Sequence, residues 1–434
     1  MRFLGVGETN DLGDMYLRLM SRGHQVRVYM SDPASEGVMQ GMLPFTDDWR
    51  DELEWVRNAG NEGVILFEGA SDGNTQDELR AEGYNVIGGS ALGDRLEGDR
   101  AFGQGFLREA GIATIPTHEF EDFDAALRFV RERPRRYVLK LNGTGWQSNT
   151  TYLGEMENGA DMLAMLHVTR KRWPSDCDVS FVLMDRVSGV EVGVGSFFNG
   201  REFLKPANLD WEHKRFFPGD VGELTGEMGT VVTYRRAEKT FDATLGRLES
   251  KLQASGYCGY INLNTIVNDE GIWPLEFTSR FGYPGFPILD ALHVDTWDEI
   301  FARMISRDGT SFRTHDGYSV GVVMTVPPFP YSEGYEKLGK NTPINFTDEM
   351  TEQDQDAIHF GEVAMHEGQL VTAGMIGYIA VVTGRGGTVQ AARDSAYRVV
   401  NKIVIPNVRY RNDIGERVMS DGLHELERLG WLHE

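Results

Sequence analysis

Apolar and polar residues along the first 90 positions repeat the order strand, turn, helix, strand. Residues 2–7 form a short apolar run that ends in glycines, and residues 12–22 place apolar side chains at helical spacing. Another apolar run follows at 26–30, and the same alternation returns over 63–83. A strand, a glycine turn, a helix and a strand form a βαβ unit with parallel strands. We therefore predict a small doubly wound α/β domain at the N-terminus.

The central part of the chain predicts alternating helices and strands. Residues 95–110 and 118–133 fit helices, and 137–143 fits a strand that leads into a polar, glycine-rich loop. Residues 179–187 fit a strand, and we expect 189–198 to be its hairpin partner, followed by a turn at Asn199 and Gly200.

The last part of the chain changes from mixed to strand-rich. Residues 259–276 predict a β-hairpin, 289–306 a helix, and the segment from 317 onward mainly strands. A helix over 388–403 follows, with Thr388 as the expected N-cap.

Composition and charge exclude several classes of protein. Lys plus Arg number 43 and Asp plus Glu 66, so the formal net charge is −23. Such a surface repels phosphate backbones, which argues against nucleic-acid binding. No run approaches ~18 apolar residues, and polar residues arrive as early as Glu8, so we expect neither a membrane span nor a signal peptide. The two cysteines, Cys177 and Cys258, form no metal motif and suit a cytoplasmic protein with buried thiols.

The hairpin at 259–276 carries the strongest cluster of candidate ligands. Asn262 and Asn264 alternate on one strand and face the same side, as Glu276 and Thr278 do on the return strand. Oxygen ligands on a rigid hairpin suit Mg²⁺, and Arg280 follows where it could contact a transferring phosphoryl group. The alternative is an ordinary hairpin with polar cross-strand pairs.

The segment PLEFTSRFG at 274–282 resembles the metal-binding strand of ATP-grasp carboxylate–amine ligases. Other segments resemble the phosphoribosylamine–glycine ligase (glycinamide ribonucleotide synthetase) family of purine biosynthesis within that group. They are LEGDRAFGQGFLREAGIATIPT at 96–117, YVLKLNGTGW at 137–146, FVLMDRVSGVEV at 181–192, EHKRFFPGDVGELTGEMGTV at 212–231 and VRYRNDIGERV at 408–418. Because these segments occur in order over nearly the whole chain, the resemblance is far more specific than any single glycine motif.

The resemblance implies a fold of the α/β and α+β multidomain class. An N-terminal Rossmann-like parallel sheet would occupy 1–94. An ATP-grasp domain with two lobes would occupy 95–311, with a small lobe inserted at about 118–190. A small C-terminal α+β domain would occupy 312–434.

It also implies a function and a set of site residues. The chain would be an ATP- and Mg²⁺- (or Mn²⁺-) dependent ligase that joins an amino acid to an amine through an acyl phosphate, as a cytoplasmic monomer or homodimer. Catalysis would fall to Arg280 and Lys140, and a metal would bind Glu276, Thr278 and Asn264. The implied ATP-binding residues are Arg100, Lys140, Met184, Asp185, Arg186, Val187 and Glu191. The implied substrate-binding residues are Gly7, Glu8, His213, Lys214, Arg215, Glu227 and Met228.

Several positions depart from the family pattern, and most of them lie at the implied substrate sites. The phosphate loop lacks its usual lysine and reads Gly-Trp-Gln-Ser at 145–148, and the first turn lacks its usual arginine and reads Gly-Val-Gly-Glu-Thr-Asn at 5–10. Residues 226–229 read Gly-Glu-Met-Gly, residues 283–285 read Tyr-Pro-Gly, and Thr278 replaces an asparagine. Two alternatives follow: a specialised ligase with a different amine or amino acid, or a non-catalytic nucleotide-binding sensor.

Some candidate residues have a purely structural alternative. The run from His213 to Arg215 is either a pocket for a substrate or a solvated basic segment. Trp146 is either a lid over the nucleotide or a packing anchor. Asp32 and Asp72 follow strands and either contact a ligand or cap turns. Gly5 and Gly7 form a GxG without a third glycine, which disfavours a dehydrogenase-type dinucleotide site.

Overall fold

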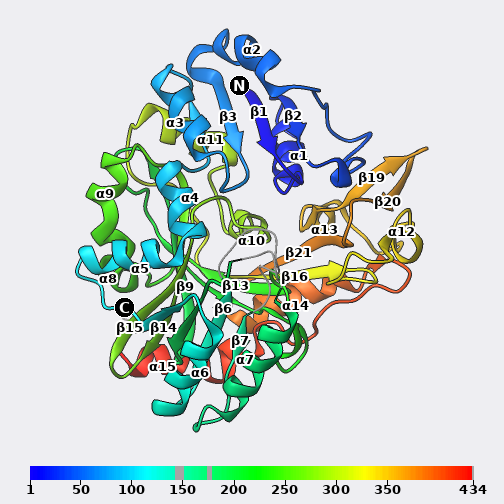
Figure 1. Cartoon of the computed structure of the whole chain (residues 1–434). Helices are drawn as coiled ribbons and strands as arrows, with labels where there is room; N and C mark the ends of the chain where they lie inside the picture. The colour runs from blue at the N-terminus through cyan, green and yellow to red at the C-terminus, as the bar shows by residue number, and fades with distance from the viewer. Residues whose placement is uncertain (142–150, 174–177, 433–434) are drawn as a thin grey trace. The chain divides into compact units, whose positions relative to one another are not determined.

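The computed structural model describes residues 1–141, 151–173 and 178–432, which divide into two compact units (Figure 1). Unit 1 comprises Met1–Ile112, Glu191–Thr265 and Glu276–Glu434, and unit 2 comprises Ala113–Val190 and Ile266–Leu275. Each unit is described in turn. The division into three domains at 94 and 311 stays a prediction.

Unit 1 begins with the predicted parallel sheet. Its strand order is β2-β1-β3-β4, and β1 pairs in parallel with both β2 and β3. Helices connect these strands, as expected for a doubly wound domain, and the interior is apolar because β1 and β3 are buried along almost their whole length. The elements are β1 (Arg2–Gly7), α1 (Gly13–Ser21), β2 (Gln25–Met30), α2 (Leu53–Arg57), β3 (Gly63–Phe67), α3 (Gly73–Ala81), β4 (Val86–Ile87), α4 (Ala91–Gly98) and α5 (Arg100–Glu109).

A second, larger sheet contains eight strands in the order β15-β14-β9-β10-β13-β16-β21-β18. The helix α14 (Val389–Val400) packs on β16 and β21, and Thr388 caps it as predicted by accepting a hydrogen bond from the Ala391 amide. The strands are β9 (Val190–Asn199), β10 (Asn208–Glu212), β13 (Gly229–Thr233), β14 (Cys258–Asn268), β15 (Gly271–Thr278), β16 (Tyr318–Thr325), β18 (Ile358–Phe360) and β21 (Tyr378–Gly386).

Shorter elements complete unit 1. Three small two-stranded ribbons lie outside the large sheet: β11 (Arg215–Phe217) with β12 (Val221–Leu224), β17 (Asn345–Phe346) with β22 (Ile403–Val404), and β19 (Val363–His366) with β20 (Gln369–Thr372). The remaining α-helices are α8 (Glu238–Ala243), α9 (Glu249–Ala254), α10 (Gly285–Asp290), α11 (Trp297–Ser306), α12 (Tyr335–Leu338), α13 (Glu352–Gln355) and α15 (Leu423–Arg428).

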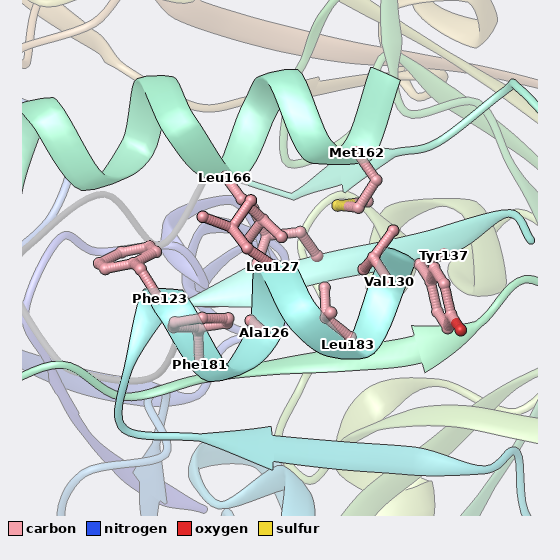
Figure 2. Packing of buried hydrophobic residues seen from close by; sticks show 10 residues of the cluster. Phe123, Ala126, Leu127, Val130, Tyr137, Met162, Leu166, Phe181 and Leu183 are labelled. Carbon is pink, nitrogen blue, oxygen red and sulfur yellow. The ribbon is translucent and has the colours of Figure 1, made fainter. Parts of the chain in front are cut away.

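Unit 2 is a four-stranded sheet, in the order β5-β8-β6-β7, covered by two helices. Figure 2 shows apolar side chains of both helices meeting those of the strands, and the ten buried residues of this cluster form the core of unit 2. The elements are β5 (Thr117–Phe120), α6 (Phe123–Glu132), β6 (Tyr137–Leu141), β7 (Tyr152–Leu153), α7 (Ala160–Arg172) and β8 (Phe181–Asp185).

Four sequence-based expectations about elements were wrong. The helix expected over 118–133 begins only at Phe123, because the Asp122 side chain caps it and residues 117–120 form strand β5. The segment 179–187 does not form a hairpin with 189–198, because β8 pairs with β5 and β6 whereas β9 pairs with β10. The helix expected over 95–110 is divided, because the Asp99 side chain accepts from the Phe102 amide and starts a new helix there. The helix expected over 289–306 is also two helices, because a capping box at Thr296 starts α11.

None of the helices in the described ranges is both long and apolar enough to cross a lipid bilayer. Of the two cysteines, Cys258 is buried as expected, and Cys177 lies outside the described residues.

Candidate functional site

A polar surface lies on one face of the large sheet, centred on β9. Glu191, Gly193 and Gly195 alternate along β9 and face the same way. A side chain at Gly193 would collide with the carboxylate of Asp210 on β10, and one at Gly195 would collide with the phenol of Tyr260 on β14. The two glycines therefore make room for polar side chains from both neighbouring strands.

Asp210 is a buried acid of this surface whose carboxylate accepts hydrogen bonds from neighbouring side chains. Its Oδ2 accepts from Nδ2 of Asn208 at 3.0 Å and from Nδ2 of Asn262 at 2.6 Å. Burial and the neighbouring Glu212 raise the pKa of Asp210. Burial and Glu212 also raise the pKa of Glu227 well above its usual range, and its Oε1 has no partner. Burial and mutual repulsion thus favour the protonated forms of these two carboxyls.

Lys214 is the cation at the centre of this surface. It lies two residues after the end of β10 and follows His213. Its Nζ lies 2.9 Å from Glu212, 3.1 Å from Glu276 and 3.7 Å from Glu191. Burial alone would lower the pKa of Lys214, but the three carboxylates outweigh it and raise the pKa well above the usual value. Lys214 therefore remains an ammonium ion at all physiological pH values.

Glu276 on β15 joins several of the residues that the sequence singled out. Its Oε1 accepts from Lys214 Nζ at 3.1 Å and its Oε2 accepts from Arg100 Nη2 at 2.9 Å. Asn264 on β14 donates to Glu191 at 2.7 Å, and Glu191 in turn approaches Lys214. The structure thus brings together Arg100, Lys214, Glu276, Glu191 and Asn264 in unit 1.

The donor chemistry here suits a divalent cation. Glu276, Asn264 and Thr278 offer carboxylate, amide and hydroxyl oxygens on two adjacent strands, and Mg²⁺ prefers such oxygens together with water and phosphate oxygens. Three carboxylates surround Lys214, so an additional positive charge would reduce their mutual repulsion. Among the described residues, no group of three or more acidic, histidine or cysteine side chains forms a complete metal cage on its own. These three side chains could therefore supply only part of the coordination of such a cation.

Arg280 is positioned by α4. Its Nε donates to Glu97 at 3.1 Å, and the other Glu97 oxygen accepts from the Ser279 amide at 2.8 Å. This contact fixes the chain where β15 ends.

His213 is buried and neutral. Its Nδ1 lies 3.2 Å from the Gly229 carbonyl, and the Gly415 amide donates to its Nε2 at 3.2 Å. Burial, together with Arg417 and Arg411, lowers its pKa to about 4. The ring holds three backbone segments together.

The neighbours of His213 are also engaged. Arg215 donates to the Gly222 carbonyl at 2.6 Å, and Met228 is fully buried, with its amide bonded to the His213 carbonyl. The interpretation of 213–215 as a solvated basic segment is therefore wrong, since Lys214 lies among carboxylates and His213 in the interior.

The predicted adenine-binding residues lie in unit 2. Met184 is buried with Ile115 and Val182, and Val187 packs against the same cluster. Lys140 on β6 pairs in register with Val182 on β8.

The polar residues beside them form ion pairs. Asp185 accepts from Arg135 at 2.8 Å, and Arg186 pairs with Glu155 at 2.6 Å. The loop residues 145–148, including the candidate lid residue Trp146, lie outside the described residues.

The N-terminal turn presents acidic rather than basic side chains. Gly7 ends β1, and the exposed Glu8 accepts a weak hydrogen bond from Ser71 at 3.4 Å. The Asp32 side chain accepts from the Ala34 amide at 2.9 Å, so its interpretation as a turn cap is confirmed.

Sequence reasoning did not select Asp210 and Glu212, although a signal was present. The segment 208–212 reads Asn-Leu-Asp-Trp-Glu, in which polar residues alternate with Leu209 and Trp211, both buried. Such alternation predicts a strand with one polar face. Tyr260 was missed although it alternates with Asn262 and Asn264 on β14, because a tyrosine at that position also fits an apolar core.

Comparisons with known proteins identify two matching family models. The model described as the phosphoribosylglycinamide synthetase ATP-grasp (A) domain matches residues 98–286, and the phosphoribosylglycinamide synthetase C domain model matches 319–417. The chain is 26% identical to a phosphoribosylamine–glycine ligase of Listeria innocua over 82% of each protein, and 25% identical to one of Listeria monocytogenes over 94% of this chain and 95% of the relative.

Solved structures show the same fold. The crystal structure of phosphoribosylamine–glycine ligase from Thermotoga maritima superposes with a TM-score of 0.71 at 21% identity, covering 95% of this chain and 100% of that one. The biotin carboxylase domain of Hydrogenobacter thermophilus 2-oxoglutarate carboxylase, solved with MgADP, gives a TM-score of 0.64 at 13% identity, covering 100% and 98%.

Proposed function

Because the chain belongs to the phosphoribosylglycinamide synthetase family of ATP-grasp ligases, we propose that it joins the carboxylate of an amino acid to an amine as a phosphoribosylamine–glycine ligase or a diverged relative. It is an ADP-forming ligase that makes a C–N bond. The proposal includes glycine as the first acid to test, Mg²⁺ or Mn²⁺ as the metal, and a cytoplasmic monomer or homodimer as the working form.

The reaction proceeds in two steps. A carboxylate oxygen of the amino acid attacks the terminal phosphorus of ATP, the bond from phosphorus to ADP breaks, and an acyl phosphate forms. The amine nitrogen then attacks the acyl carbon, the C–O bond breaks, and the phosphate leaves with that electron pair and the proton given up by nitrogen. No protein nucleophile is needed, and charge stabilisation carries most of the catalysis.

We call the group formed by Lys214, Arg100, Glu276, Glu191, Glu212 and Asn264 the Lys214 cluster. This cluster supplies that charge stabilisation in unit 1. Lys214 and Arg100 both contact Glu276, so two cations lie within reach of one carboxylate. Arg280, which pairs with Glu97, would contact the transferring phosphoryl group. Glu276, Asn264 and Thr278 would hold the metal, which when bound offsets the negative charge of the phosphates.

The nucleotide-binding roles rest on unit 2 and on Glu191. Lys140 would bind ATP phosphates, and the backbone from Met184 to Val187 would contact the adenine edge. Either Asp185 or Glu191 would bind the ribose hydroxyls. The apolar cluster around Met184, which includes Ile115 and Val182, supports this role because an adenine ring needs an apolar surface to stack on.

The single observation that carries the proposal is the contact of Lys214 and Arg100 with Glu276 on the polar face of the large sheet. A second candidate, a nucleotide-binding sensor without ligase activity, is favoured by the missing loop lysine at 145–148 and by Thr278 in place of asparagine.

One assay separates these candidates. Purified protein is mixed with ATP, MgCl₂, hydroxylamine and one amino acid at a time, and hydroxamate and ADP are measured. A ligase forms hydroxamate with at least one acid, because hydroxylamine traps the acyl phosphate. ATP binding without ADP release for any amino acid would establish the sensor and reject the ligase.

A further inference from the structure

A cavity of about 340 Å³ lies beside the start of β10, apart from the Lys214 cluster. Its walls come from three segments of unit 1: residues 204–207 between β9 and β10, the helix α8, and residues 311–312. Because β10 extends from Asn208 to Glu212 at ~3.3 Å per residue, the cavity and the cluster lie at opposite ends of this strand, roughly 15 Å apart. The proposed ligase reaction uses none of the residues that line the cavity.

The inner wall of this cavity is apolar and held by aromatic packing. Phe241 on α8 packs edge to face against Phe203, at 5.0 Å between ring centroids. Phe312 packs in the same way against Phe197 at 5.7 Å and Tyr234 at 5.6 Å. Both lining phenylalanines are buried, so their rings have little freedom to move. The cavity therefore offers a preformed apolar surface to a ligand.

The backbone around the cavity is already hydrogen-bonded. The amide of Lys205 donates to the Thr310 carbonyl, and the Lys205 carbonyl accepts from the Phe312 amide. The Ser311 carbonyl accepts from Nη1 of Arg303 at 2.6 Å. A ligand would therefore be recognised mainly through the side chains that line the cavity.

These side chains include charges of both signs. Glu238 and Asp242 are four residues apart on α8, so they lie on the same side of that helix. Lys205 belongs to a different wall, and all three side chains are exposed. With the other described residues, none of the three forms a side-chain hydrogen bond or an ion pair. The cavity thus keeps one cation and two anions available for a ligand.

The size and the chemistry of the cavity fit a zwitterion that carries an apolar group. Small-molecule sites typically have ~300–1,000 Å³, mostly apolar walls and a few polar groups. At ~30 Å³ per water molecule, 340 Å³ corresponds to roughly eleven waters, which is the size of a ligand with about a dozen non-hydrogen atoms. The lysine matches a carboxylate, the two acids match an ammonium group, and the phenylalanine rings match an aromatic or branched side chain.

We propose that this cavity binds a free α-amino acid with an aromatic or branched apolar side chain, at a place separate from the ligase reaction. A ligand with only one kind of charge would leave the opposite charge of the cavity without a partner. Glycine would leave the apolar wall in contact with water. The inference does not depend on the proposed ligase activity, because it concerns binding by residues outside that site.

Binding of four probes tests the expected ligand chemistry. The full chain, without nucleotide, is titrated with L-phenylalanine, with phenethylamine, which lacks the carboxylate, with hydrocinnamate, which lacks the ammonium group, and with glycine. Isothermal titration calorimetry and ligand-observed NMR measure each Kd. We expect a Kd of about 1 mM for phenylalanine, as the usual affinity per ligand atom gives, and binding at least ~3-fold weaker for the other three probes.

Variants at exposed positions assign each charge of the ligand to its partner. Glu238→Gln combined with Asp242→Asn should weaken phenylalanine and phenethylamine by at least ~3-fold and leave hydrocinnamate no weaker. Lys205→Met should weaken phenylalanine and hydrocinnamate by a similar factor and leave phenethylamine unchanged. Asp308→Asn is the matched control, because Asp308 is an exposed acid close to Ser311 in sequence that does not line the cavity. The thermal midpoint of each variant shows that its fold is retained.

The pattern across probes and variants decides the matter. The two opposite losses, with unchanged binding in Asp308→Asn, would establish the cavity as an amino-acid site. The absence of phenylalanine binding at 10-fold above the expected Kd would overturn the inference, as would equal binding of glycine or of either singly charged probe. Phenylalanine binding that is the same in all variants would place the ligand elsewhere on the protein and would also overturn it.

Discussion

At the scale of single residues, charge decides what the candidate site can do. Lys214 faces three glutamates, and Glu276 faces two cations, so no acid or base of this cluster acts alone. A group so tightly paired is a poor proton donor or acceptor but a strong, fixed electrostatic partner. This arrangement favours stabilisation of the phosphoryl and acyl transition states over acid–base catalysis.

Replacing either of two charged residues should therefore reduce turnover sharply. Glu276→Gln and Lys140→Met should each lower kcat for hydroxamate formation by at least ~10²-fold, because each removes a charge from the proposed reaction site. Glu270→Gln, an exposed residue at the tip of the same hairpin as Glu276, should keep wild-type turnover. The turnover of all three variants is measured as the steady-state rate of ADP release. Near-normal turnover in both reaction-site variants would contradict the assignment.

The same residues show how far sequence reasoning reaches. Glu276 and Asn264 were found because alternation on a hairpin places them on defined faces. Glu212, whose carboxylate lies 2.9 Å from Lys214 Nζ, was missed although it is close in sequence, because the local pattern predicts a polar strand face but not that Glu191 and Glu276 from other strands meet Lys214 there. The sequence likewise did not predict that His213 is buried, because its hydrogen-bond partners Gly229 and Gly415 are distant in sequence.

At the scale of elements, local patterns predicted which residues form strands more reliably than which strands pair. The segments 2–7, 26–30 and 63–67 became β1, β2 and β3 in a parallel sheet because helical crossover connections return the chain to the same end of the sheet. The predicted pairing of β8 with β9 was wrong. Two apolar strands that are close in sequence resemble a hairpin, but these two belong to different sheets.

One contact between elements gives a pH-dependent prediction. Asp14 on α1 accepts from Arg18 at 2.7 Å, lies 2.8 Å from His359 Nδ1 on β18, and accepts from the Phe360 amide at 3.3 Å. Burial alone would raise the pKa of Asp14, but Arg18 and His359 outweigh it and lower the pKa from 3.8 to about 2. A lowered pKa stabilises the folded state above the unfolded value, and this contribution disappears as the pH falls towards 2.

Asp14→Asn should consequently destabilise the protein in a pH-dependent way. The expected loss in free energy of unfolding is about 2 kcal/mol at pH 7, and the difference from wild type should shrink at pH 3. Urea titrations followed by circular dichroism at both pH values measure it, with Asp47→Asn at an exposed position as the control. A difference that is the same at pH 3 and pH 7 would show that the ionised carboxylate is not what links α1 to β18.

At the scale of the whole molecule, each of the two units has an apolar core of its own. In unit 2, Leu166 on α7 is fully buried and packs with Leu127 and Phe181, as Figure 2 shows. In unit 1, a separate cluster including Leu4, Ile65 and Phe67 lies around the parallel sheet. Separate cores allow separate cooperative transitions, because a cavity in one core does not remove contacts from the other.

Differential scanning calorimetry of two core variants tests this separation. Leu166→Ala should destabilise unit 2 by about 2–5 kcal/mol, because it leaves a cavity in a fully buried position, and should lower the midpoint of one thermal transition. Asp14→Asn should lower the midpoint of the other transition, since its partners all lie in unit 1. Val168→Ala, at a position on α7 that is 41% exposed, should shift neither midpoint appreciably. If Leu166→Ala and Asp14→Asn displaced a single common transition together, the two units would unfold as one cooperative body, and a substitution in either core would then change the stability of both.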